Sequence, residues 1–111
     1  MKRLWFALSY SFDGLAAAWR DEAAFRQEVA LAIVFIPLAV FIAPSTVSRA
    51  LMIGSILIVL VIELLNTAVE AVVNRIGLDH DSLAKKAKDA ASAAVFVALV
   101  NAVTIWLIVL V

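Results

Sequence analysis

The chain has 111 residues, of which 66% are hydrophobic and only 16% are charged, and its nine basic and nine acidic side chains cancel to a net charge of zero. A soluble domain carries about 25% charged residues, so this composition excludes a water-soluble globule and predicts a protein that faces lipid. A zero net charge gives no positive field to attract a nucleic acid, and the lack of cysteine excludes disulfides and thiolate chemistry.

An amphipathic helix on the membrane surface is predicted over residues 1–27. Apolar side chains recur there every three or four residues, and most charged side chains lie off that stripe. The apolar positions are Leu4, Trp5, Leu8, Phe12, Leu15 and Trp19. A cleaved signal peptide is the alternative, but Ser9, Ser11 and Asp13 interrupt the apolar core of about 7–15 residues that a signal needs.

Three membrane-spanning helices are expected next, because a hydrocarbon core of about 30 Å requires about 20 residues of helix. We place them at residues 28–43, 46–75 and 89–111, with a polar loop at 76–88. Pro37 is expected to bend the first span, Ser45 or Thr46 to cap the second, and Gly77 to end it. The whole chain, residues 1–111, is therefore predicted to be a single all-α membrane domain.

The basic residues predict how the chain crosses the membrane. Eight of the nine Lys and Arg side chains precede the first span or lie between the second and third, and Arg49 alone lies in the other connection. Basic residues concentrate on the cytoplasmic side, so we expect the amino terminus and the 76–88 loop there.

Glu63, Asn66 and Glu70 are the most costly polar residues of the predicted second span. A carboxylate inside a membrane helix costs at least ~2.5 kcal/mol, and the spacing of these residues places all three on one helix face. One interpretation is that they form hydrogen bonds between helices. The other is a site for a metal and a phosphate, which would need both carboxylates and the amide.

Two further charged groups lie near the same membrane boundary. One consists of Asp21, Glu22 and Glu28, and the other of Lys88 and Asp89. Each could be a solvated helix end or a basic anchor. Together, carboxylates suited to Mg²⁺, a lysine suited to a phosphate and a deeper glutamate suited to a base predict a phosphoryl-transfer site. Three helices are too few to shield all these groups from lipid, so an oligomer is expected.

Three segments closely resemble the bacterial integral-membrane diacylglycerol kinases: EAAFRQE at 22–28, ELLNTAVEAVVNRIG at 63–77 and AKDAASAA at 87–94. The resemblance covers nearly the whole chain. It implies a homotrimer of three-span protomers in the bacterial inner membrane that transfers the γ-phosphate of ATP to sn-1,2-diacylglycerol, yielding phosphatidic acid. Relatives that phosphorylate undecaprenol share the Glu-x-x-Asn-x-x-x-Glu stripe, but segment 22–28 favours the diacylglycerol branch, with undecaprenol as the alternative acceptor.

The resemblance also implies roles for individual residues. Glu63 would be the general base, with Asn66 and Glu28 orienting the site. Glu22 and Glu70 would hold the Mg²⁺ that bridges the ATP phosphates, Lys88 would neutralise the transferred phosphate, and Asp89 would help to seat the nucleotide. Further residues implied near ATP are Arg3, Tyr10, Asp79, His80 and Asp81. Residues implied beside the lipid substrate are Ser11, Trp19, Ala24, Phe25, Arg26, Gln27, Glu28, Arg49, Glu63, Ser92 and Trp106. The sequence departs from the family at Phe6, where many members carry lysine, and in the loop Leu-Asp-His-Asp-Ser.

A function of another class would use the same stripe differently. Glu63, Asn66 and Glu70 could relay protons through a small oligomeric carrier or channel. Such a relay would favour titratable groups across the whole membrane. The outer half of the spans is instead apolar apart from Ser55, Asn101 and Thr104, which favours the kinase.

Overall fold

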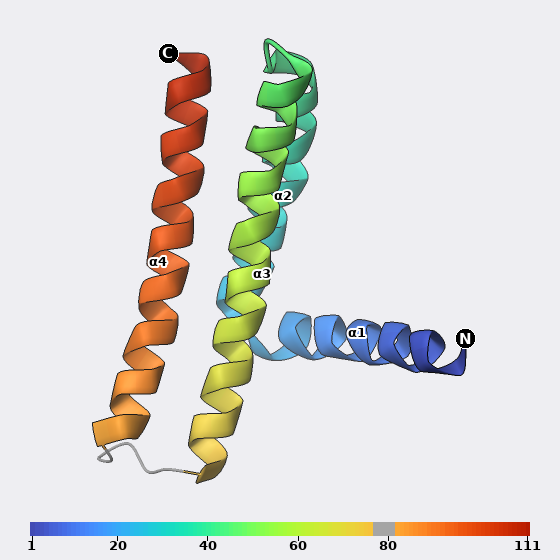
Figure 1. The fold of residues 1–111 in the computed structure, drawn as a ribbon, viewed down its shortest axis with the longest axis vertical. Coiled ribbons are helices and arrows are strands. Elements are labelled where there is room, and N and C mark those ends of the chain that lie inside the picture. Colours follow the sequence, from blue (N-terminus) through green and yellow to red (C-terminus); the bar gives the residue numbers. More distant parts are fainter. Residues whose placement is uncertain (77–81) are drawn as a thin grey trace.

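The computed structural model describes residues 1–76 and 82–111, and these residues form four α-helices with short connections. The helices are α1 (Lys2–Asp21), α2 (Ala23–Ile42), α3 (Thr46–Ile76) and α4 (Ser82–Leu110). Figure 1 shows α2, α3 and α4 running side by side, while α1 projects away from them and ends in the free amino terminus. The last three helices are each long and apolar enough to cross a membrane, which confirms the all-α prediction with three candidate spans.

The boundary between the first two helices differs from the prediction. The chain leaves the helical conformation at Glu22, with φ −119° and ψ 108°, and residues 23–27 form the first turns of α2. Arg26 makes this break possible, because its guanidinium donates to the main-chain oxygens of Trp19 at 2.7 Å and Arg20 at 3.2 Å. These oxygens lie in the last turn of α1, where a helix leaves its carbonyls without partners.

The predicted loop at 76–88 is also shorter than expected. Residues 82–88 belong to α4, and α3 continues to Ile76. Polar composition suggested a loop here, yet the Lys85 Nζ and the Asp89 Oδ2 lie 2.6 Å apart at positions i and i+4, a spacing that supports a helix. The expected helix end at Gly77 lies outside the described residues.

The connection from α2 to α3 agrees with the prediction that Ser45 or Thr46 caps α3, and Ser45 is the one that does. The Ser45 Oγ accepts a hydrogen bond from the main-chain N–H of Ser48 at 3.0 Å, which satisfies one of the unpaired donors of the first turn. Arg49 of α3 also contacts the end of α2, because its Nε donates a hydrogen bond to the main-chain oxygen of Val40 at 3.2 Å. The helix α2 continues through Pro37 without an interruption.

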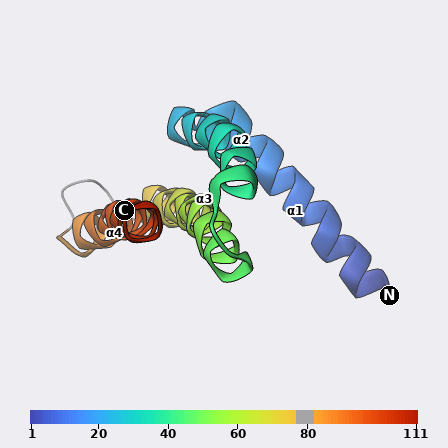
Figure 2. The same cartoon turned by 90° about the horizontal axis from the view of Figure 1, so that it is seen from above.

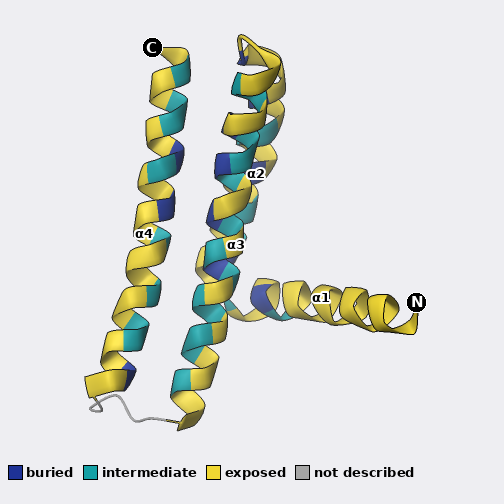
Figure 3. Ribbon diagram, viewed as in Figure 1, coloured by how far each residue is buried: buried dark blue, intermediate teal, exposed yellow. Residues whose placement is uncertain are grey.

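Small side chains let the three long helices pack closely. Seen from above, α3 lies between α2 and α4 (Figure 2). One buried cluster joins Ala39, Ala43 and Met52, and a second joins Val59 to Ala98 and Ala102. Such residues are typical of helix interfaces in membranes, where close packing replaces the hydrophobic effect. The remaining faces are largely exposed (Figure 3), and many of their exposed side chains are large and apolar, as contact with lipid requires.

The unequal lengths of α2 and α3 decide where α1 meets the bundle. The two helices run in opposite directions from the turn at 43–45, and α2 has 20 residues whereas α3 has 31. At 1.5 Å per residue, α2 is about 30 Å long and α3 about 46 Å. The first residues of α2 are therefore level with the part of α3 that carries Glu63, Asn66 and Glu70, and α1 leaves the bundle at that level.

Candidate active site

Glu63 lies on the packed face of α3. The buried residues of this helix are Met52, Ser55, Val59 and Glu63, which recur every three or four positions. Only 4% of Glu63 is exposed, so the carboxylate continues a stripe that faces the other helices of the bundle. A carboxylate in this position is costly unless it has a partner or a function.

Three carboxylates, from α2, α3 and the junction at Glu22, interact with Glu63. The Glu63 carboxylate interacts electrostatically with those of Glu22 and Glu70, and the Glu28 carboxylate interacts with that of Glu63. Like charges repel one another at short range, and a cation or a shared proton is the usual way to relieve that repulsion. The structure thus brings together the two acidic groups that the sequence placed far apart along the chain.

Asn66 connects this cluster by hydrogen bonding. Its side-chain Nδ2 donates to the Oε1 of Glu70 at 3.2 Å. The Oδ1 of Asn66 and the Oε2 of Glu28 are buried and accept no hydrogen bond from the described residues. Buried polar atoms rarely lack partners, so these two acceptors suit a donor that a ligand brings.

A cleft of about 690 Å³ lies between α1 and α3, and its lining is mostly apolar; we call it the polar cleft because it also carries acidic and amide side chains. Asp21 and Glu22 line it from the α1 side, and Glu70 and Asn74 line it from α3. Carboxylate oxygens are ligands that Mg²⁺ prefers, and Mg²⁺ commonly uses one or two carboxylates together with substrate phosphates and water. Groups of three or more acidic or histidine side chains that could hold a metal by themselves do not occur among the described residues. The number of carboxylates that Glu22 and Glu70 provide is the number that Mg²⁺ uses when phosphates and water complete its coordination.

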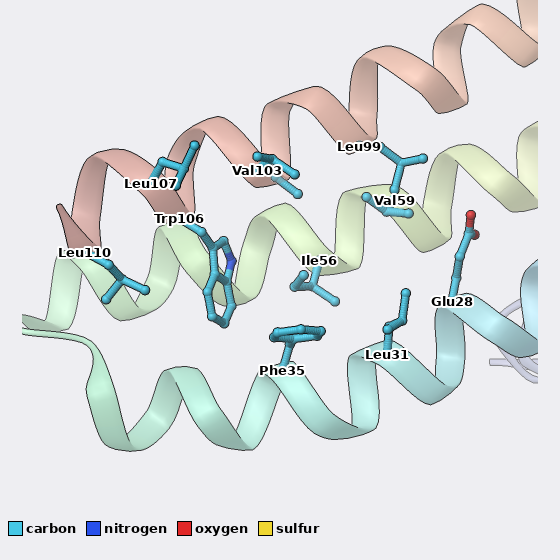
Figure 4. Close-up of a pocket in the computed structure, with 11 residues that line it drawn as sticks. Glu28, Leu31, Phe35, Ile56, Val59, Leu99, Val103, Trp106, Leu107 and Leu110 are labelled. Carbon is cyan, nitrogen blue, oxygen red and sulfur yellow. The ribbon is translucent and has the colours of Figure 1, made fainter.

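A second cleft, of about 310 Å³, lies between α2, α3 and α4 and is apolar. Glu28 is at one end of it and Leu110 at the other (Figure 4). Along its length the rings of Phe35 and Trp106 meet edge to face, with centroids 5.4 Å apart and an interplanar angle of 86°. Such a cleft suits an apolar chain with a polar group at the Glu28 end.

Lys88 and Asp89 are not part of either cleft within one chain. They lie on the first turns of α4, where Asp89 is paired with Lys85. In both views α4 is on one side of α3 and α1 projects from the other (Figures 1 and 2). The structure of a single chain therefore does not bring these two residues together with Glu22.

The remaining predicted residues fall into four groups. Ser11 lines the polar cleft, and Glu28 and Trp106 line the apolar cleft. Arg26 and Arg49 donate to helix-end carbonyls, and Phe25 is buried. The residues that line neither cleft and are largely exposed are Arg3, Tyr10, Trp19, Ala24, Gln27 and Ser92, and Tyr10 stacks on Phe6 with centroids 6.5 Å apart. Asp79, His80 and Asp81 lie outside the described residues.

Sequence reasoning missed several residues that line the clefts. Gly14, Thr67 and Asn74 line the polar cleft, and Leu31 and Phe35 line the apolar one. The only signal for the first group was a glycine inside a predicted helix, which is an unfavourable position for it. The second group is ordinary apolar sequence, so nothing in it distinguished cleft-lining residues from lipid-facing ones.

Comparisons with known proteins show which proteins this chain is similar to. The family model described as prokaryotic diacylglycerol kinase matches residues 9–110. A diacylglycerol kinase of Pseudomonas aeruginosa is 49% identical over 106 residues, covering 96% of this chain and 86% of that protein. A diacylglycerol kinase of Escherichia coli is 44% identical over 104 residues, covering 94% and 85%. One of Haemophilus influenzae is 46% identical over 97 residues, covering 87% and 82%.

Proposed function

This chain belongs to the prokaryotic diacylglycerol kinase family, and we propose that it transfers the γ-phosphate of ATP to the free hydroxyl of diacylglycerol to give phosphatidic acid. The family and the three apolar helices identify a multi-pass bacterial membrane protein. We also propose which residues form the active site, that they bind Mg²⁺, that the protein is a homotrimer, and how it is oriented in the membrane.

The position of Glu63 between two different clefts carries the proposal. On one side it interacts with Glu22 and Glu70, which line the polar cleft between α1 and α3. On the other it interacts with Glu28, which lies at the end of the apolar cleft. A charged nucleotide and an apolar lipid would each occupy the cleft that suits it and meet at Glu63.

Glu63 is proposed to act as the general base. The glycerol hydroxyl attacks the γ-phosphorus, its proton passes to a Glu63 oxygen, a new oxygen–phosphorus bond forms, and the bond to the departing ADP breaks. Proton removal by a positioned carboxylate typically contributes about 10²–10⁴-fold to a rate. The Oε2 of Glu28, which lacks a partner among the described residues, is placed to accept a hydrogen bond from the lipid headgroup.

Glu22 and Glu70 are proposed to hold Mg²⁺ together with the ATP phosphates. When bound, the ion neutralises charge that develops on the phosphate oxygens. Asn66 donates to Glu70, and so it would orient the carboxylate that binds the ion. Glu22 and Glu70 each repel the carboxylate of Glu63, which supports a cation at this place.

Lys88 and Asp89 are proposed to complete the site from a neighbouring copy in a homotrimer. Their helix starts on the opposite side of α3 from α1 (Figure 2), and the cleft with Glu22 and Glu70 has no lining residue from α4 among the described residues. A lysine that neutralises the transferred phosphate would therefore have to come from a second protomer.

The proposed orientation places α1 on the cytoplasmic surface of the inner membrane. Large apolar side chains of α1 are exposed in the single chain, among them Trp5, Leu8 and Phe12. An interfacial helix buries such residues among lipid headgroups. This location also puts the polar cleft on the side where ATP is available and supports a cytoplasmic amino terminus.

Phosphate transfer in mixed micelles tests the proposal. Purified protein is given MgATP with dioleoylglycerol or undecaprenol in parallel, and the phosphorylated lipids are quantified. Faster formation of phosphatidic acid is the expected result. Faster formation of undecaprenyl phosphate would overturn the diacylglycerol assignment, and no transfer to either lipid, with proton flux in vesicles, would favour a relay.

A further inference from the structure

Gly14 lies in the middle of α1, where the fold itself gives no reason for a glycine. Glycine is the poorest helix former apart from proline, so it weakens a helix at an interior position. The backbone does not need it either, because no described glycine has a positive φ. A Cβ built at Gly14 would meet no atom within 4 Å, so packing within the chain does not require its absence.

Gly14 does line the polar cleft between α1 and α3. The cleft is acidic where Asp21, Glu22 and Glu70 lie. Away from them it is lined by small or uncharged residues, including Ser11, Gly14 and Asn74. Gly14 is eight residues before Glu22, a separation of about 12 Å along a helix.

We propose that the space left open by Gly14 receives the nucleoside part of the nucleotide, so that Gly14 determines the fit of the phosphate donor. This inference rests on the proposed function, which places the phosphates at Glu22 and Glu70. A nucleoside is uncharged and carries a flat base, and it fits a region of the cleft that carries uncharged side chains, including Gly14 and Leu15. Asn74 offers amide donors and acceptors at the α3 wall of the same cleft.

The inference predicts a loss that depends on side-chain size at position 14. Gly14→Ala should raise the KM for MgATP a few-fold, and Gly14→Leu on the order of tenfold, because overfilling a site that fits its ligand is costly. The KM for dioleoylglycerol should stay unchanged in both variants. Gly14→Ala should also keep its kcat, since the phosphate end of the cleft is untouched.

Two control variants separate this effect from a general effect on the helices. Ala16→Leu places the same bulk on an exposed position of α1 outside the cleft. Gly54→Ala makes the same small change in α3, where a Cβ also meets no atom within 4 Å. Both controls should keep the wild-type KM for MgATP.

Competition with two inhibitors tests which part of the nucleotide lies near Gly14. In Gly14→Leu the inhibition constant of MgADP should rise on the order of tenfold, while that of magnesium tripolyphosphate, which lacks a nucleoside, should stay unchanged. Equal losses for both inhibitors would overturn the inference, and so would an unchanged KM for MgATP or a changed oligomeric state without a nucleotide effect. If wild-type protein transfers no phosphate from ATP, the proposed function fails first and this inference fails with it.

Discussion

Trp106 of α4 donates its indole N–H to the main-chain oxygen of Met52 in α3, over 3.2 Å, and the same oxygen accepts a hydrogen bond from Ser55 at 2.8 Å. This contact joins α3 and α4 beside the apolar cleft. The ring of Trp106 also meets that of Phe35 in α2, so one side chain connects all three long helices.

Trp106→Phe is therefore expected to lower stability moderately. The variant keeps an aromatic ring against Phe35 but loses the donor to Met52, whose oxygen retains Ser55. We expect the free energy of unfolding to fall by about 0.5–1.5 kcal/mol in a detergent unfolding titration. Trp5→Phe, at a position that is 67% exposed, is the control and should change little. Equal losses in the two variants would show that the hydrogen bond contributes nothing specific.

Glu63→Gln is expected to abolish turnover while leaving the fold intact. The amide keeps the size of the side chain but cannot accept the proton of the attacking hydroxyl. We expect kcat to fall by about 10²-fold or more, with nucleotide binding and oligomeric state retained. Binding is measured with a non-hydrolysable MgATP analogue. A variant that still turns over at the wild-type rate would refute the assignment of Glu63 as the base.

Asn66→Leu is expected to weaken the metal site. The change removes the donor to the Glu70 Oε1 while keeping a side chain of similar volume in a half-buried position. Loss of a residue that orients a metal ligand typically weakens metal affinity by about 10–100-fold, so the half-saturating Mg²⁺ concentration should rise. Leu65→Ala, one residue away and exposed, serves as the control. An unchanged Mg²⁺ requirement in Asn66→Leu would mean that Glu70 needs no such support.

Chelation should reveal the same metal in the wild-type protein. Removing divalent ions with EDTA is expected to stop phosphate transfer, and adding Mg²⁺ in excess is expected to restore it. Glu22→Gln and Glu70→Gln should each require more Mg²⁺ than wild type, because one anionic ligand is lost. Full activity in EDTA would contradict a metal-dependent site.

Arg26→Ala is expected to loosen the joint between α1 and α2. The variant leaves the main-chain oxygens of Trp19 and Arg20 without their donor at the end of α1. Spin labels on α1 and α3 should then report a broader range of distances, and the KM for MgATP should rise because α1 forms one wall of the cleft proposed to bind the nucleotide. Arg20→Ala, whose side chain pairs only with neighbouring Asp21 among the described residues, is the control. Identical distance distributions in wild type and Arg26→Ala would disprove this role for Arg26.

Hydropathy and spacing predicted much of this architecture. The three apolar helices, the serine cap at Ser45 and the Glu63 stripe follow from local sequence, since each depends on residues within a few turns of one another. The break in the helix at Glu22 does not follow from local sequence, because neither glycine nor proline marks it. The hydrogen bonds that support it come from Arg26 in the next helix. The first turns of α4 were predicted to be a loop because their side chains are charged. These charges instead support a helix through the pair of Lys85 and Asp89.

The candidate site, too, could be predicted from the sequence only in part. That Glu22, Glu28, Glu63 and Glu70 lie close together was predicted from their common depth, and the electrostatic interactions among them agree. Sequence could not reveal that Ser11 and Gly14 face α3, because this depends on the direction in which α1 leaves the bundle. It also could not reveal that Lys88 lies across α3 from α1, since depth alone does not determine the side of a helix on which a residue lies.

The length of α2 has a consequence for how this protein can change during evolution. The 20 residues of α2 determine the distance from the turn at 43–45 to the junction with α1. Inserting one helical turn into α2 would move α1 about 5 Å farther from the turn at 43–45 and separate Glu22 from Glu70. A change of length in the middle of a plain apolar helix would thus disrupt the candidate active site, although none of the inserted residues would belong to it.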